Sequence, residues 1–180
     1  MIHVLYLDDE SHNLTAFRAA FRRVFKVHVT TEPTEAVQLL REHPIEVVIS
    51  DQKMPALSGV EFFELIMSDF PEPIRMLLTG HADIDAVIDA INKGQIYKYI
   101  SKPWNEAELQ ALVEEAADQF RRKRSVQKEG DRMIEQMRKA KELAAWIVEV
   151  TASGGADVPE IHEKAKKIDD ADTKNQTGRT

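Results

Sequence analysis

The chain lacks several features on which whole classes of protein depend. It has no cysteine among its 180 residues, which excludes a disulfide framework, a zinc–thiolate site and a thiol nucleophile. It has no apolar run of membrane-spanning length. Its N-terminus has no basic segment followed by an apolar stretch, so we expect no secretory signal. These absences favour a cytoplasmic setting without membrane contact.

Two further absences restrict the possible ligands. The formal net charge is −7, whereas binding to nucleic-acid phosphates needs a basic surface, so we expect no nucleic-acid partner. No GxGxxG or P-loop pattern occurs, which argues against a nucleotide cofactor. The six histidines are scattered, with no pair at the spacing of metal ligands.

Short apolar runs alternate with amphipathic segments through the first two thirds of the chain. Five such units predict a parallel sheet with helices wound on both of its faces, which is a doubly wound α/β fold. The third and fourth runs are apolar with little alternation, as expected for strands covered on both faces. The predicted strands are residues 2–7, 27–31, 45–50, 74–79 and 96–101, and the predicted helices are residues 12–25, 33–43, 59–70, 83–94 and 105–120.

Residues with strong positional preferences mark two of the helix ends. Pro33 lies in the first turn of the second predicted helix, and Gly94 ends the fourth. The first helix has an apolar stripe, which we expect to face the sheet. The members of this stripe are Leu14, Phe17, Ala20, Phe21 and Val24.

Charged and polar residues follow the predicted strands at the edge where doubly wound sheets bind ligands. The first strand gives Asp8 and Asp9, the third Asp51, the fourth Thr79 and the fifth Lys102. Three adjacent carboxylates would raise one another's pKa unless a cation neutralised them. A set of oxygen ligands suits a hard cation such as Mg²⁺. A hydroxyl and an ammonium nearby would hold the oxygens of a phosphate group.

Four motifs at successive strand ends resemble the receiver domain of bacterial two-component response regulators. They are "LDDE", "ISDQKMPALSGVEF", "LLTGHA" and "YISKPW", in this order within residues 1–122. One motif alone is weak, whereas the ordered set is highly specific. The resemblance implies a flavodoxin-like five-stranded parallel sheet with strand order 2-1-3-4-5. It also implies a phosphoacceptor protein, not an enzyme with a separate substrate, whose partner is a sensor histidine kinase or phosphotransfer protein.

The resemblance assigns roles to individual residues. Asp51 would be the phosphoacceptor. Asp9 and Asp51 would bind Mg²⁺ directly, Asp8 through water, and the backbone carbonyl of Lys53 would complete the protein ligands. Thr79 would bind a phosphate oxygen after modification.

The remaining motif residues correspond to the family's switch and its supporting loops. Lys102 would pair with a phosphate oxygen, and the bond between Lys102 and Pro103 would be cis. Tyr99 stands where the family carries its aromatic switch residue. The loop after the phosphoacceptor matches at Met54, Pro55 and Gly59.

Simpler interpretations exist for each residue taken alone. Asp9 or Ser11 would be an ordinary cap for the first helix. Thr79 before a glycine fits a turn, Lys102 fits a solvated surface lysine, and Tyr99 fits core packing. The three acids together with Lys102 make these interpretations the weaker ones.

A haloacid-dehalogenase-type phosphatase would share the aspartate, Mg²⁺, threonine and lysine. Such an enzyme carries a second aspartate two residues after its nucleophile, as general acid and base. This position is Lys53 here, so no acid is placed to protonate a leaving group or activate water. We therefore rank a phosphatase well below a receiver.

The last third of the chain predicts a helical extension over residues 123–152 and a flexible polar tail over residues 153–180. The extension has an apolar seam at alternating spacings of four and three, which is a candidate coiled coil. It would either fold back on the receiver or pair with a second copy, and we favour the homodimer. The seam consists of Val126, Gly130, Met133, Met137, Ala140, Ala144 and Ile147.

No output domain is recognisable in the sequence. A helix-turn-helix does not fit in one helix and a tail. Two interpretations remain open, a free-standing receiver and a fragment of a larger regulator. For the fragment, the stretch from "LLTGHA" to "SKPW" resembles receivers that precede HD-GYP phosphodiesterases or PP2C-type phosphatases.

Overall fold

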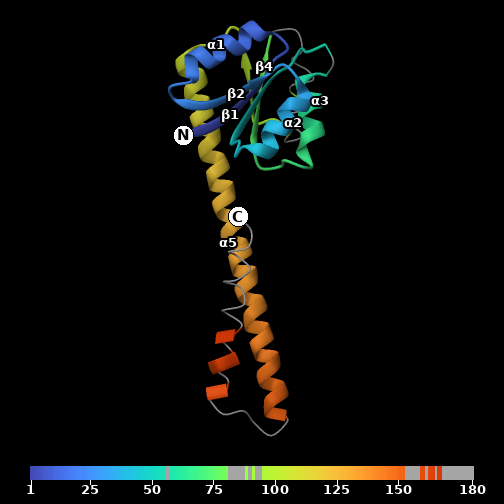
Figure 1. Ribbon diagram of the computed structural model, residues 1–180, viewed down its shortest axis with the longest axis vertical. Coiled ribbons are helices and arrows are strands. Elements are labelled where there is room, and N and C mark those ends of the chain that lie inside the picture. The colour runs from blue at the N-terminus through green and yellow to red at the C-terminus, as the bar shows by residue number, and fades with distance from the viewer. Residues whose placement is uncertain are drawn as a thin grey trace. The chain divides into compact units, whose positions relative to one another are not determined.

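The computed structural model describes residues 1–55, 57–80, 88, 91, 95–152, 159–160, 162–164 and 166–167. Its first part contains a five-stranded sheet, all parallel, in the order β2-β1-β3-β4-β5 (Figure 1). This confirms the predicted doubly wound fold and its strand order. The strands are β1 (Ile2–Leu7), β2 (Phe25–Thr30), β3 (Val47–Asp51), β4 (Ile74–Thr79) and β5 (Lys98–Ser101), and the helices are α1 (Ser11–Phe21), α2 (Pro33–Glu42), α3 (Gly59–Met67) and α5 (Glu106–Ala152).

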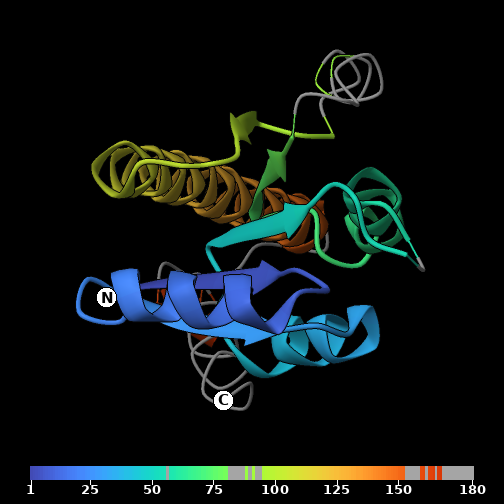
Figure 2. The same ribbon diagram turned by 90° about the horizontal axis from the view of Figure 1, so that it is seen from above.

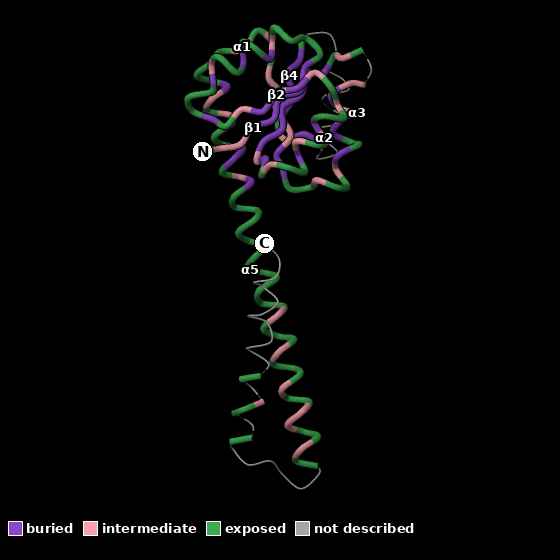
Figure 3. The backbone as a smooth tube through the Cα atoms, in the orientation of Figure 1, coloured by how far each residue is buried: buried purple, intermediate pink, exposed green. Residues whose placement is uncertain are grey.

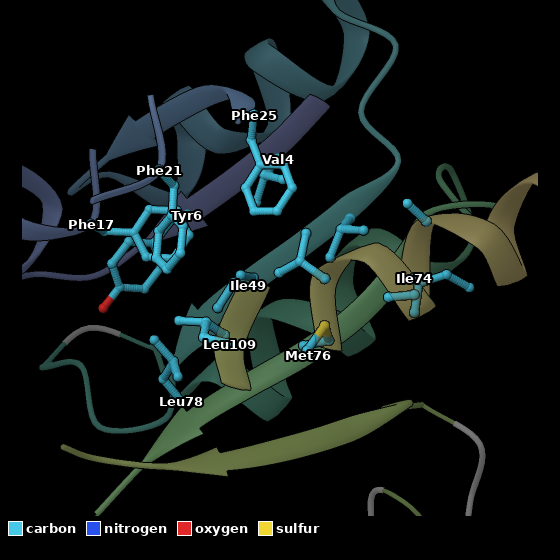
Figure 4. Close-up of a cluster of buried hydrophobic side chains, with 14 of the residues drawn as sticks. Val4, Tyr6, Phe17, Phe21, Phe25, Ile49, Ile74, Met76, Leu78 and Leu109 are labelled. Atoms are coloured by element: carbon cyan, nitrogen blue, oxygen red, sulfur yellow. The ribbon is translucent and has the colours of Figure 1, made fainter. Parts of the chain in front are cut away.

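Helices cover both faces of the sheet. In Figure 2, α1 and the first part of α5 lie on one side of the strands, and α2 and α3 lie on the other. Side chains alternate along a strand, so β1 sends Val4 and Tyr6 into the first cluster (Figure 4) and Leu5 and Leu7 into the second. Every residue of β3 is buried, as predicted for a strand covered on both faces. The purple segments of Figure 3 follow this two-sided core.

The first helix is shorter than the sequence pattern predicted. It ends at Phe21, and its apolar stripe is buried at Leu14, Phe17 and Phe21. Our placement of Val24 on this stripe was wrong, because the chain has already left the helix and Val24 is 41% exposed. The N-cap is Glu10, without a side-chain cap hydrogen bond, so the capping role considered for Asp9 or Ser11 is not observed.

The second and third helices begin as their first residues favour. Pro33 stands in the first turn of α2, as predicted. Ser58 and Glu61 form a capping box at the start of α3, in which each side chain bonds the other residue's backbone N–H. The predicted helix over residues 83–94, including Gly94, falls outside the described residues except at Ile88 and Ile91, which are helical.

The last helix continues well past the receiver fold. α5 runs without interruption from Glu106 through Gly130 to Ala152, which confirms the predicted helical extension. The chain divides into two compact units, Met1–Arg124 and Ser125–Thr180. Residues 159–160, 162–164 and 166–167 are also helical. The division of the last third into a helical extension over residues 123–152 and a flexible polar tail over residues 153–180 stays a prediction. Within the described part of the chain, no helix is both long enough and apolar enough to cross a membrane.

Two glycines offer a matched test of how closely the start of α3 packs against the end of β3. A Cβ on Gly59 would lie 2.4 Å from the backbone oxygen of Asp51 and 2.6 Å from Leu77 Cδ1, whereas a Cβ on Gly130 would meet nothing within 4 Å. We expect Gly59→Ala to lower the free energy of unfolding by about 1–3 kcal/mol. We expect Gly130→Ala to stabilise its helix by about 1 kcal/mol. Urea unfolding followed by circular dichroism measures both, and equal effects of the two substitutions would contradict the close approach at Gly59.

Candidate phosphoryl-acceptor site

Parallel pairing brings four of the predicted site residues to one edge of the sheet. Leu7 pairs with Ser50, so Asp8 and Asp51 follow neighbouring positions on β1 and β3. Thr79 pairs with Ser101 at the ends of β4 and β5. The backbone N–H of Lys102 donates to the Thr79 carbonyl at 2.9 Å, which joins the loop after β5 to the end of β4.

Lys102 is the cation at the centre of this edge. Its Nζ forms an ion pair with Asp8 Oδ2 at 2.8 Å and a second, short ion pair with Asp51 Oδ1. Asp8 is 1% exposed and Asp51 7% exposed, so one ammonium pairs with two buried carboxylates. Burial opposes the charge on Lys102, yet Asp51 and Asp8 outweigh it and raise the pKa of Lys102. The Lys102–Pro103 bond is cis, as the resemblance implied.

Asp8 is saturated with hydrogen-bond donors. Oδ1 accepts from the backbone N–H of Glu10 at 2.9 Å and from Asn13 Nδ2 at 3.0 Å. Oδ2 accepts from Lys102 and, in a short bond, from the buried Tyr6 hydroxyl. Burial favours the neutral acid, but the bonds from Lys102, Tyr6 and Asn13 outweigh it and hold the pKa of Asp8 below its ordinary value.

Our reading of the sequence missed Tyr6 and Asn13. Tyr6 lies inside an apolar run and Asn13 inside an amphipathic helix pattern. Neither pattern by itself indicates a role at the site. One signal pointed to Tyr6, because residues two apart on a strand share a face. That rule places its side chain on the same side as Asp8.

Asp9 differs from Asp8 in its surroundings. It is exposed, and partial desolvation together with the negative charges of Asp8, Asp51 and Glu10 raises its pKa. A cation bound beside Asp9 would therefore favour its charged form and lower its pKa.

The loop after β3 fixes the proposed acceptor. The backbone N–H of Lys53 donates to Asp51 Oδ2 at 2.7 Å. Gln52 ties this loop to the neighbouring strand and helix, because its N–H donates to the Leu78 carbonyl and its own carbonyl accepts from Gly59 N. We did not anticipate the role of Gln52, and the metal-binding role of the Lys53 carbonyl stays a prediction.

The two proposed switch residues lie apart from the ion pairs. Thr79 is 3% exposed, and its hydroxyl donates to the carbonyl of Gly80 at 2.8 Å. Tyr99, on β5, is 40% exposed. In this structure the Thr79 hydroxyl is thus engaged with backbone, and the Tyr99 side chain is open to solvent instead of packed in the core.

The residues suit Mg²⁺ in charge and in donor chemistry, although they are not gathered around a metal-sized gap. Asp8, Asp9 and Asp51 supply only carboxylate oxygens, which hard cations prefer. Among the described residues, no three acids or histidines are arranged to hold a metal ion. At this edge Asp51 Oδ1 and Asp8 Oδ2 are paired with Lys102.

Comparison with known proteins agrees with this geometry. Residues 4–114 match the family model of the response regulator receiver domain. The chain belongs to this family. It is similar to the hydrogenase transcriptional regulatory protein HoxA of Bradyrhizobium diazoefficiens, with 32% identity over 127 residues, which are 71% of this chain and 26% of HoxA.

Two solved structures resemble the receiver. A response regulator receiver domain protein from Clostridium thermocellum has 30% identity and a TM-score of 0.62, covering 66% of this chain and 96% of that one. The signal receiver domain of an HD domain-containing protein from Pseudomonas fluorescens Pf-5 has 30% identity and a TM-score of 0.64, covering 69% and 92%. The chain spans about a quarter of the length of HoxA. The comparisons therefore establish the receiver and not an output.

The raised pKa of Asp9 gives a prediction with a definite sign. An acid whose pKa is higher in the folded state destabilises the fold above its unfolded pKa, here 3.8. Without divalent cations at pH 7, we expect Asp9→Asn to raise the free energy of unfolding, by less than about 1 kcal/mol because Asp9 is exposed. We expect this gain to vanish below pH 4.

With Mg²⁺ present, we expect the unmodified protein to be more stable to unfolding than Asp9→Asn. The reason is that a ligand stabilises the folded protein that binds it. Thermal unfolding with and without Mg²⁺ measures the effect, and Asp69→Asn, at an exposed acid after α3, is the control. A Mg²⁺-dependent stabilisation of Asp9→Asn equal to that of the unmodified protein would contradict the assignment.

Proposed function

We propose that Asp51 accepts a phosphoryl group from a phosphohistidine of a sensor histidine kinase or phosphotransfer protein. Receiver domains in general work with such partners. The observation that carries the proposal is the Asp51 carboxylate, buried at the end of β3, with one oxygen on Lys102 and the other on the Lys53 N–H. An Asp51 oxygen attacks phosphorus, the phosphorus–nitrogen bond breaks, and an acyl phosphate forms while the imidazole leaves.

The surrounding residues prepare Asp51 for this step. The Lys53 N–H fixes one oxygen and leaves the other facing Lys102, whose ammonium is placed to meet the charge of an incoming phosphoryl group. We propose that Asp9, Asp51 and the Lys53 carbonyl hold Mg²⁺, with Asp8 acting through water. When bound, Mg²⁺ supplies further neutralisation of phosphoryl charge.

We propose that the receiver itself catalyses only its own phosphorylation and dephosphorylation. The position two residues after Asp51 is Lys53, whose backbone N–H bonds the acceptor. A lysine there cannot replace the general acid and base of a haloacid-dehalogenase-type phosphatase. The phosphorylated state is thereby kept long enough to act as a signal.

We infer that Thr79 and Tyr99 transmit the modification. A phosphoryl group adds about −1.5 to −2 charge at neutral pH, which attracts the Thr79 hydroxyl away from Gly80. Movement of this loop gives the exposed Tyr99 room to turn inward. The receiver then shifts between two states that differ in the surface around β4 and β5.

We also propose that α5 mediates self-association through its extension. Five large apolar side chains of this helix are more than half exposed, and an exposed apolar stripe of this kind is typical of an interaction surface. Their spacing agrees with the predicted seam at Val126, Met133 and Met137. The five are Val126, Met133, Ile134, Met137 and Val148.

Phosphorylation at Asp51 is tested with acetyl phosphate, Mg²⁺ and intact-protein mass spectrometry. We expect the unmodified chain to gain one phosphoryl group and Asp51→Asn to gain none. Asp51 has one oxygen on Lys102 and the other on the Lys53 N–H, whereas Asp8, which also pairs with Lys102, has both of its oxygens held by further donors from Tyr6, Glu10 and Asn13. Asp69→Asn should behave as the unmodified chain, and chelation of Mg²⁺ should slow the reaction strongly. If Asp51→Asn were modified as fully as the unmodified chain, Asp51 would not be the phosphoacceptor.

Self-association is tested by light scattering on the chain, on a version ending at Arg124, and on the double variant Met133→Glu, Met137→Glu. We expect a dimer for the chain and monomers for the other two, because charge in the seam removes its apolar contact. The control is Lys128→Gln, Arg132→Gln, which changes the net charge by the same amount outside the seam. Monomers throughout at high micromolar concentration, with and without phosphorylation, would exclude the homodimer.

A further inference from the structure

Tyr6 is a buried polar side chain that the proposed chemistry does not yet use. It lies on β1, is 0% exposed, and its hydroxyl donates to Asp8 Oδ2. The strand period of two places Tyr6 and Asp8 on the same face. The hydroxyl is the only side-chain oxygen among the described buried members of this cluster, and it bonds directly to the acid that pairs with Lys102.

Aromatic packing, and not the site itself, fixes the Tyr6 ring. The ring centroid lies 4.6 Å from that of Phe17. Phe17 and Phe21 both contact Trp104, with centroids 6.1 and 5.5 Å apart. Trp104 stands two residues after Lys102. Figure 4 shows the Tyr6 oxygen at the margin of this cluster. One packed group thus places both the hydroxyl and the loop that carries the ammonium.

The Tyr6 hydroxyl and the Lys102 ammonium donate to the same atom, Asp8 Oδ2. Oδ1 accepts from Glu10 N, and Asn13 Nδ2 donates to both oxygens, at 3.0 and 3.1 Å. A carboxylate has about four lone-pair positions, and these donors use them. These bonds restrict the orientation of Asp8, which is one of the two carboxylates paired with Lys102.

We propose that Tyr6 is a positioning residue, whose hydroxyl aims Asp8 Oδ2 at Lys102 and thereby holds the ammonium beside Asp51. The proposal rests on the proposed phosphoacceptor function of Asp51. During transfer an Asp51 oxygen becomes bonded to phosphorus, and its pairing with Lys102 is lost. Asp8 is then the anchor from which Lys102 reaches the phosphoryl oxygens, and Tyr6 keeps that anchor in place.

The substitution Tyr6→Phe removes only the hydroxyl. We expect the maximal rate of phosphorylation by acetyl phosphate to fall about five- to tenfold, because a misaligned Lys102 stabilises the developing charge less well. The Mg²⁺ concentration for half-maximal rate should change by less than about twofold, because the proposed direct ligands are Asp9 and Asp51, whereas Tyr6 bonds Asp8. Tyr97→Phe is the matched control, since it removes a hydroxyl bonded to the exposed Glu115 at 2.7 Å.

A second measurement reads the position of Lys102 without any phosphoryl transfer. A hydrogen-bonded lysine ammonium exchanges slowly enough to give a ¹⁵N–¹H NMR signal. We expect this signal for Lys102 in the unmodified chain and in Tyr97→Phe, and its loss or broadening in Tyr6→Phe. If the unmodified chain accepts no phosphoryl group, the proposed function fails, while loss of the signal in Tyr6→Phe still supports the positioning role.

Two results would overturn the proposal. The first is a Tyr6→Phe protein with the original maximal rate and an unchanged Lys102 signal. The second is a parallel loss of maximal rate, Mg²⁺ response and thermal stability, which would show a general packing defect instead of a positioning effect.

Discussion

The pairing of Lys102 with Asp8 and Asp51 is the constraint on which the rest of the site depends. Asp8 and Asp51 are 1% and 7% exposed at neighbouring strand ends. A buried charge without a partner costs several kcal/mol, so two such carboxylates require a cation. The chain supplies it from residue 102, 94 positions after Asp8, which is possible only when β5 closes the sheet in the observed order. The ion pairs at this edge therefore depend on the placement of β5 in the sheet.

Much of this edge could be predicted from the sequence, for a physical reason. Parallel strands all present their carboxyl ends at one edge, so Asp8, Asp51, Thr79 and Lys102 are brought together by topology alone. Topology does not specify hydrogen bonds. The hydrogen bonds of Asn13 to Asp8 depend on how the first helix is rotated about its axis. The bonds by which Gln52 holds the loop after Asp51 depend on the path of that loop. The end of α1 was misjudged for a similar reason, because periodicity continues to Val24 while the chain turns after Phe21 to enter β2.

The acceptor is immobilised mostly through its own backbone. The Lys53 N–H holds Asp51 Oδ2, Gln52 joins the loop to Leu78 and Gly59, and Gly59 allows α3 to begin against the Asp51 carbonyl. These contacts leave the side chain little freedom, which lowers the reorganisation needed before transfer. The neighbouring Asp9 is exposed and charged without such ties. The proposed acceptor Asp51 is therefore buried and held by hydrogen bonds, whereas the neighbouring Asp9 is exposed.

A route from this site to α5 follows from contacts that share residues. The Lys102 N–H donates to the Thr79 carbonyl, so the two residues for which we propose a response to phosphorylation are joined by one backbone hydrogen bond. β5 lies directly before Lys102. Its first residue, Lys98, and the preceding residue, Tyr97, both contact Glu115 of α5, at 3.8 and 2.7 Å respectively. If phosphorylation displaces β5 as proposed, these two contacts connect that displacement to α5. The helix continues through Gly130 to Ala152 and carries exposed apolar side chains at Met133 and Met137. The proposed association surface therefore lies on the same helix that contacts the last strand of the sheet.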